Sequence, residues 1–162
     1  MGSIKNMMEE ISCDNDNNQI KILVGKIDTD LYWLNEAPVA IQEFAGWRKL
    51  DAGSVSNLGR AFSKFRDRLD QFEQYMNGDN IEEITILLFS DGMATDHYEE
   101  GMEQLKTSSL YRKARRYAVN PGEIFDPNVL VDFTGSKERI FDMTNMDALA
   151  VEKILLNIIY DR

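Results

Sequence analysis

The residues best placed to do chemistry in this 162-residue chain follow one apolar run, in the stretch ITILLFSDGMATD at positions 84–96. Five of the first six residues are apolar, which is typical of a strand buried on both faces of a mostly parallel sheet. Asp91 follows at the strand's C-terminal end, where open α/β sheets bind ligands. Asp91 is therefore a candidate metal ligand. The alternative is a simple turn, after which Asp96 caps the next helix.

The charge balance restricts the class of partner. Asp and Glu number 28 against 18 Lys and Arg, which gives a net charge of -10 and a pI near 4.6. Nucleic acids and anionic membranes reward clustered Lys and Arg, so we expect neither as a partner. The balance suits solubility, cations or a basic protein surface, and a solvated acidic surface is the favoured interpretation. The length predicts one domain over 1–162, with a real hydrophobic core.

The sequence also predicts a cytoplasmic location. Cys13 is the only cysteine, so the chain holds no internal disulfide and fits a reducing compartment. No apolar run approaches the ~18–20 residues of a membrane span. The first residues, MGSIKNMMEEIS, lack the basic and apolar regions of a signal peptide.

Periodicity predicts alternating helices and strands. We expect helices over 3–11, 57–75, 96–114, 128–133 and 146–159, strands over 20–27, 31–34, 84–89, 116–119 and 140–143, and a mixed loop over 38–47. Ser56 is the predicted N-cap of the second helix, and the basic run 112–116 is read as a helix end that complements the dipole rather than a binding patch. The alternation predicts a parallel-sheet α/β layer fold.

Three segments, in order, resemble a known family. They are AGSVSNLGRAF before the long helix, LLFSDGMATD, and the tail that runs from RRYAVN through FDPNVLVDFTGSKERIFDMTNMDALAVEKIL. Together they resemble a von Willebrand factor A (VWA)-like domain, and within that superfamily the bacterial tellurium-resistance TerY-like branch. The resemblance extends from Ser3 to the C-terminus. It implies a Rossmann-like, mostly parallel sheet with helices on both faces.

The resemblance also implies a metal-ion-dependent adhesion site. Ser56 stands where the family has a loop Thr ligand, and Asp91 stands at its strand-end Asp ligand. Ser54, Gly92 and Asp96 lie nearby in structural roles. The family usually holds Mg²⁺, a hard cation that takes oxygen ligands and keeps several waters. An acidic side chain of a protein partner then completes the metal's coordination.

One part of the family pattern is missing from the sequence. The family's D-x-S-x-S turn and the central first strand before it are absent, and Met1-Gly2-Ser3-Ile4 resembles the end of that motif. We therefore expect weak Mg²⁺ binding. The acidic pair Asp28 and Asp30 is either a replacement ligand pair or a strand-end turn, and the turn is the favoured interpretation.

Loss of that strand would leave its two neighbours with unpaired backbone groups. Three explanations stay open: a fragment or a gene begun at an internal Met, direct pairing of the second and fourth strands, or a strand or covering supplied by a partner or homo-oligomer. We favour truncation relative to the family, with the remaining strands rearranged or oligomerised.

The leading functional hypothesis is a non-enzymatic protein-interaction module in a bacterial tellurium or stress-response system. A metal-free degenerate scaffold is the alternative. A phosphoester hydrolase or nucleotide-binding protein that uses Asp91 is the third reading. The chain has no G-x-G-x-x-G, no P-loop and one histidine, His97. It shows no nucleophile–base pair, so we expect no enzyme.

Overall fold

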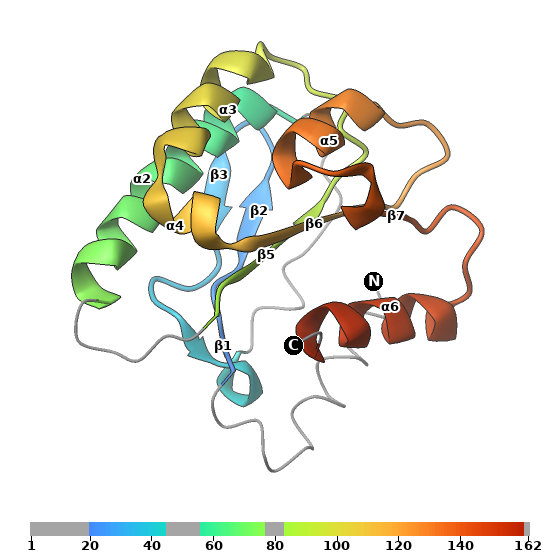
Figure 1. Ribbon diagram of the computed structural model, residues 1–162, viewed down its shortest axis with the longest axis horizontal. Helices are drawn as coiled ribbons and strands as arrows, with labels where there is room; N and C mark the ends of the chain where they lie inside the picture. The colour runs from blue at the N-terminus through green and yellow to red at the C-terminus, as the bar shows by residue number, and fades with distance from the viewer. Residues whose placement is uncertain (1–19, 45–55, 77–82, 161–162) are drawn as a thin grey trace. The chain divides into compact units, whose positions relative to one another are not determined.

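The computed structural model describes residues 20–44, 56–76 and 83–160 (Figure 1). They divide into two compact units. The larger, here called the sheet unit, holds the described residues of 27–31 and 54–144; the smaller, the hairpin unit, holds those of 1–26, 32–53 and 145–162. One domain over 1–162 stays a prediction. The predicted helix 3–11, Cys13 and Ser54 lie outside the described residues.

The sheet unit is built on three parallel strands in the order β5-β6-β7. They are β5 (Thr85–Phe89), β6 (Arg115–Asn120) and β7 (Ile140–Asp142), in a register that pairs Phe89 with Val119 and Val119 with Phe141. Parallel neighbours need a crossover. Helices α3 (Tyr98–Thr107) and α4 (Ser109–Lys113) connect β5 to β6, and α5 (Pro127–Thr134) with the short η4 (Lys137–Arg139) connects β6 to β7. The predicted parallel α/β class is confirmed.

One core joins the helices to one face of this sheet. Helix α2 (Leu58–Met76) contributes the predicted apolar side: Leu58, Ala61, Phe62 and Leu69 are buried, and Phe65 and Phe72 are partly buried. Ile86 and Leu88 of β5 meet this side from the sheet. The remaining buried members of the core come from α3, α4, β6 and α5, among them Met102, Leu105, Leu110, Tyr111, Ala118, Val129, Leu130 and Phe133.

The opposite face of β5 is less buried than expected. Thr85 and Phe89 are exposed and Leu87 is half-buried, whereas Ile86 and Leu88 are buried. A run of apolar residues therefore predicted the strand correctly but overstated the burial of its second face. That face continues onto Tyr117 and Phe141, whose ring centroids lie 6.2 Å apart.

The helix predicted over 96–114 is two helices. Helix α3 ends at Thr107, and Ser108 is extended (φ -64°, ψ 131°) before α4 begins at Ser109. The Thr107 hydroxyl donates to the Gln104 carbonyl at 2.6 Å, a local bond that competes with continued helix. Arg112 and Lys113 occupy the last turn of α4 as predicted, while Arg115 and Arg116 open β6.

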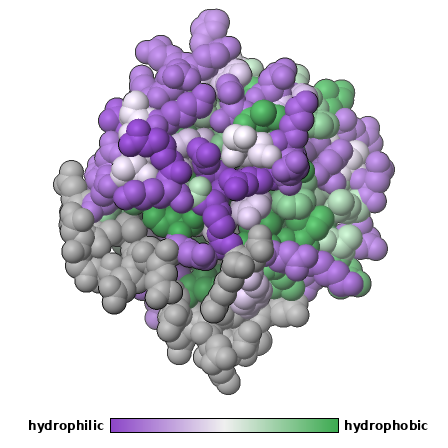
Figure 2. Space-filling model, in the orientation of Figure 1, coloured by the Kyte–Doolittle hydropathy of each residue, from purple (hydrophilic) through white to green (hydrophobic). Residues whose placement is uncertain are grey.

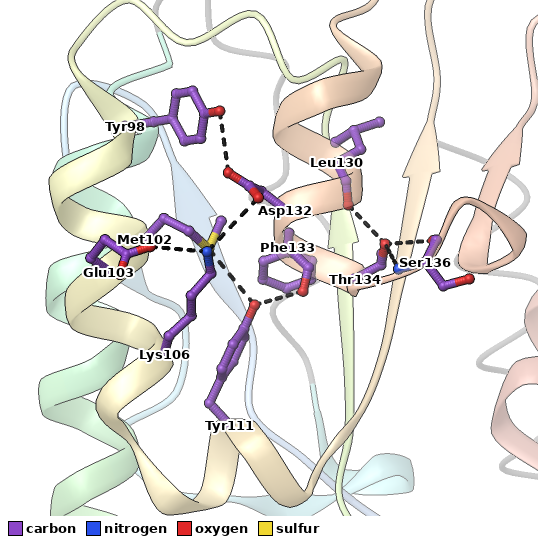
Figure 3. A network of polar contacts seen from close by, with 10 residues as sticks. All are labelled: Tyr98, Met102, Glu103, Lys106, Tyr111, Leu130, Asp132, Phe133, Thr134 and Ser136. Carbon is purple, nitrogen blue, oxygen red and sulfur yellow. Dashed lines mark hydrogen bonds and ion pairs between the residues drawn. The ribbon is translucent and has the colours of Figure 1, made fainter.

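Side-chain contacts fix α3, α4 and α5 to one another (Figure 3). The buried Tyr111 hydroxyl donates to the Phe133 carbonyl at 2.6 Å, and burial raises the pKa of Tyr111 to about 12. The Arg116 guanidinium lies over the Tyr111 ring, 4.5 Å from its centroid. Nearer the surface, Lys106 pairs with Glu103 and Asp132. Figure 2 shows hydrophilic residues over the part of the surface that α2 and α3 form, at the upper left.

The hairpin unit contains short strands and one helix. Strand β1 (Lys21–Ile22) pairs antiparallel with β4 (Val39–Ala40), which η2 (Ile41–Glu43) follows. Strands β2 (Gly25–Ile27) and β3 (Leu31–Trp33) pair in a separate sheet, and their ends at Ile27 and Leu31 belong to the sheet unit. Helix α6 (Ala148–Tyr160) buries Leu155 and Ile158. No helix in the described part of the chain is both long and apolar enough to cross a bilayer.

The strand predicted over 20–27 is divided into β1 and β2. The Asn35 side chain bonds at this break: its Oδ1 accepts from the Val24 N–H at 2.9 Å, and its Nδ2 donates to the Ile22 carbonyl at 2.9 Å. In the described sheets, β2 pairs with β3 and β5 pairs with β6. The three explanations for the missing strand stay predictions.

Candidate functional site

Five loops of the sheet unit are joined by hydrogen bonds into what we call the rim: residues 28–30, 56–57, 90–97, 121–126 and 142–144. The Asn57 N–H donates to the Asp28 carbonyl at 3.1 Å, and the Thr95 N–H donates to the Ser56 carbonyl at 3.0 Å. The Asp126 N–H donates to the Asp91 carbonyl at 2.8 Å. The rim includes the carboxyl ends of β5, β6 and β7, where the sequence placed the site.

Ser56 lies half-buried just before α2 and not at its N-cap. The helix begins at Leu58, and the Asn57 carbonyl accepts the first helical bond, from the Ala61 N–H. Asn57 therefore occupies the position predicted for Ser56. The Thr95 hydroxyl donates to Asn57 Oδ1 at 2.9 Å, so both backbone and side chain of Thr95 connect the loop of Ser56 to that of Asp91.

Asp91 lies in a tight turn just after β5. Its Oδ1 accepts from the Met93 N–H at 2.9 Å, and Ser90 Oγ accepts from the Gly92 N–H at 3.0 Å. Gly92 has φ +73°, and a Cβ there would lie 2.5 Å from the Asp126 carbonyl oxygen. Glycine is therefore required on both counts. The two loops are joined, but convergence of the Ser56 hydroxyl and the Asp91 carboxylate on one ion stays a prediction.

Asp96 caps α2, not the helix that follows it. Its Oδ1 accepts from the Gly59 N–H at 2.9 Å and its Oδ2 accepts from the Arg60 N–H at 3.0 Å. The N-cap of α3 is His97, whose side chain makes no capping bond. Sequence proximity suggested α3, but the fold brings the unsatisfied N–H groups of a distant helix closer. Both Asp96 oxygens satisfy α2, which is the structural role that the resemblance implied.

Asp28 and Asp30 form the turn between β2 and β3. Asp28 Oδ1 accepts from the Thr29 N–H at 2.8 Å, and the Asp28 N–H donates to the Asp30 carbonyl at 2.9 Å. Asp30 pairs with Lys64 at 2.6 Å and Arg60 at 3.1 Å, and the Lys64 hydrogen bond holds the pKa of Asp30 below its usual value. This geometry agrees with the favoured interpretation of a strand-end turn.

Asn120, which the sequence did not single out, organises the far end of the rim. It is fully buried and bonds Gly122 through both its amide nitrogen (2.8 Å to O) and its oxygen (3.1 Å from N). Its Nδ2 also donates to Asp142 Oδ1 at 3.1 Å. The Thr144 hydroxyl and N–H hold the pKa of Asp142 below its usual value. In the sequence, the position of Asn120 as a polar residue at the end of an apolar strand was the one feature that could have indicated this role.

The rim also exposes apolar side chains that sequence reasoning missed. Met93 is 49% exposed and Ile124 is 76% exposed. Neither belongs to a periodic pattern, so only the structure separates them from the core.

The described residues offer few ligands for the implied metal. No three His, Cys, Asp or Glu side chains among the residues that the structure describes are grouped to hold an ion. Asp96 uses both oxygens on α2, and Asp30 pairs with cations. Ser56 and Asp91 alone do not fit a tightly bound Mg²⁺.

Comparisons with known proteins show the fold and not the function. No protein-family model and no curated protein matches the chain. Proximal thread matrix protein 1 (PTMP1) from the mussel byssus matches with a TM-score of 0.66 and 14% identity, covering 98% of this chain and 42% of that one. Manganese-loaded Plasmodium vivax TRAP protein matches with a TM-score of 0.64 and 12% identity, covering 97% of this chain and 63% of that one.

The chain thus spans less than two thirds of either neighbour's length. One PTMP1 structure has a zinc-occupied MIDAS motif. At such identities the likeness carries the architecture alone, and it agrees with the parallel sheet and helix order described above. The chain has a von Willebrand factor A-like α/β fold.

Proposed function

We propose that this chain is a non-enzymatic protein-interaction module that contacts its partner through the rim. The observation that carries the proposal is the hydrogen-bonded assembly of the rim at the carboxyl ends of the strands, around Asp91. A surface built from loops that are already held together by hydrogen bonds loses little conformational entropy when it binds. The zinc-occupied MIDAS motif in one structure of the similar PTMP1 supports the same class.

We also propose the cellular context. The SDGMATD stretch and the tail from Arg115 resemble the TerY-like branch. This supports a role in a bacterial tellurium or stress-response system. The single Cys13 supports a cytoplasmic location.

We consider two modes of contact for the rim. In the metal-dependent mode, which the family resemblance implies, Ser56 and Asp91 would hold a divalent cation such as Mg²⁺ only weakly, and an acidic side chain of the partner would complete its shell. In the metal-free mode, the rim binds directly. The use of both Asp96 oxygens as a helix cap favours the metal-free mode, because it occupies a carboxylate of the same loop as Asp91.

Selection from a random dodecapeptide phage library against the immobilised chain tests the module. The selection is run in buffer with 1 mM MgCl₂ and in parallel with EDTA. We expect binders that lose at least 5-fold in affinity for Asp91→Ala. Glu83→Gln, which removes one charge at the opposite end of β5, is the matched control. Failure to select any binder, or binders insensitive to every rim substitution, would overturn the proposal.

A thermal titration separates the two modes. A cation that binds only the native state stabilises it by about 1.4 kcal/mol at 1 mM when its Kd is about 0.1 mM. We expect Mg²⁺ and Mn²⁺ to stabilise the chain by less than about 0.4 kcal/mol at 1 mM, the value for a Kd of about 1 mM. A larger stabilisation that Asp91→Ala abolishes would establish the metal-dependent mode instead.

A further inference from the structure

We propose that the rim recognises a polypeptide segment in which Lys or Arg stands next to a bulky apolar side chain. This inference rests on the proposed function, because it gives the chemistry of that module's partner. It differs from the metal-dependent mode, in which the partner is acidic.

Exposed apolar side chains supply the first part of the argument. Among the described residues of the sheet unit, the large hydrophobic side chains that are exposed are Phe89 (39%), Met93 (49%) and Ile124 (76%). All three belong to the end of β5 or to the rim loops after β5 and β6. Single exposed apolar residues are ordinary on a surface, but several at one edge indicate a contact site.

The backbone holds these loops together on either side of Asp91. The Met93 N–H donates to Asp91 Oδ1 at 2.9 Å, so Met93 is fixed beside that carboxylate. The Asp126 N–H donates to the Asp91 carbonyl at 2.8 Å, which anchors the loop that carries Ile124. The close approach of Gly92 to the Asp126 carbonyl leaves no room for a side chain between the two loops.

Charge complementarity selects the partner. Residues 89–97 and 121–126 contain four carboxylates and no Lys or Arg. Asp96 and Asp126 cap α2 and α5, while Glu123 is exposed and Asp91 half-buried. A cation approaching this surface meets negative charge with no cation of those segments in competition. A second copy of a chain with net charge -10, a nucleic acid or an anionic membrane would be repelled.

The probe is the set of rim-dependent dodecapeptides from the selection above, sequenced and resynthesised with a fluorophore. We expect Lys or Arg within two positions of a bulky apolar residue in most of them. Fluorescence anisotropy should show at least 10-fold weaker binding when the Lys and Arg are changed to Glu, and at least 5-fold weaker binding when the apolar residue is changed to Ser. EDTA should leave the affinity unchanged, and 300 mM NaCl should lower it several-fold relative to 50 mM.

Protein variants test the same contacts. Ile124→Ser and Met93→Ser should each weaken binding at least 3-fold, while Leu149→Ser, an exposed apolar residue of the hairpin unit, should not. Circular dichroism checks that each variant is folded. The proposal is overturned by rim-dependent peptides that are acidic and need Mg²⁺, by peptides indifferent to the Ser change, or by variants of Ile124 and Met93 that bind normally. Absence of any rim-dependent peptide would instead remove the proposed function itself.

Discussion

At the scale of single residues, the rim depends on polar side chains that bond across long sequence separations. Asp96 reaches the first turn of α2, 37 residues earlier in the chain, and Thr95 reaches Ser56 and Asn57. The Asp96 bonds satisfy backbone N–H groups that a helix start would otherwise leave without a protein partner, and the Thr95 bonds tie the Asp91 loop to the residues just before α2. Stability of α2 and order of the Asp91 loop are therefore coupled.

Asp96→Ala should lower the free energy of unfolding by about 1–2 kcal/mol, because two N–H groups at a helix start lose a charged acceptor. Asp96→Asn retains one acceptor oxygen and should lose less. Urea denaturation measures both. Asp67→Ala, on the exposed side of α2, is the control and should change stability by under about 0.5 kcal/mol. Equal stability of Asp96→Ala and the native chain would contradict the capping role.

Tyr111→Phe should cost about 1–2 kcal/mol, since the buried Phe133 carbonyl loses its donor. The raised pKa adds a pH dependence: the folded state holds the Tyr111 proton more tightly, so this contribution is complete below the ordinary pKa of 10 and is lost as pH rises toward about 12. Unfolding at pH 9 and pH 11 should therefore show a larger stability loss for the native chain than for Tyr111→Phe. Equal losses of stability in the native chain and in Tyr111→Phe would be evidence against a raised pKa of Tyr111 in the folded state.

Residue types and spacing predicted where the rim lies but not all of its bonds. Asp91 at the end of β5 followed from the apolar run, and Gly92 from the family pattern. The partners of Asp96 and Asn120 could not be predicted, because they depend on which loops the fold brings together. The exposure of Ile124 depends on the course of a loop that has no periodicity.

At the scale of elements, the crossing of α2 and α3 is set by two glycines. A Cβ on Gly101 would lie 1.9 Å from the Gly59 carbonyl oxygen, and one on Gly59 would lie 2.6 Å from the His97 carbonyl oxygen. At these two positions the neighbouring backbone lies too close for any side chain larger than that of glycine. The crossing therefore fixes how α3, and the Asp91 loop that leads into it, lies against α2.

Gly101→Ala should lower the free energy of unfolding by about 3 kcal/mol, because overpacking against backbone outweighs the helix propensity that Ala gains. Gly122→Ala is the matched control: its nearest neighbour would lie 3.7 Å away, so we expect a change under about 0.5 kcal/mol. Chemical denaturation of both variants provides the comparison. A tolerated Gly101→Ala would mean that the two helices can separate at little cost.

Helix and strand types were predicted well where apolar periodicity was long, as in α2, and poorly at breaks made by single polar residues. The Thr107 hydroxyl bonds the Gln104 carbonyl where the helix predicted over 96–114 breaks, and Asn35 bonds at the gap between β1 and β2. In both places a local polar contact interrupts the element. Periodicity does not register such contacts, because they involve one residue and not a repeat.

At the scale of the whole molecule, the fold follows from the pattern of helices and strands, whereas the net charge of -10 affects what the molecule can bind. Alternating elements predicted the architecture, which the similar structures share at 12–14% identity. Charge says nothing about the fold, but it restricts association. At the rim, carboxylates lie without Lys or Arg in residues 89–97 and 121–126, so the proposed partner must supply positive charge there.

The outer side of β5 has a consequence for handling the protein in solution. Within the described part of the sheet unit, this strand pairs only with β6, and its sequence TILLF holds no Lys or Pro, the residues that commonly act as gatekeepers against edge-to-edge stacking. Thr85→Lys places a charge at an exposed position of the strand. Light scattering during concentration should show slower growth of large particles for this variant than for the native chain, and identical growth would mean that the strand's outer side is already shielded. If Thr85→Lys does slow particle growth, colloidal behaviour rather than folding sets the concentration at which this protein can be studied.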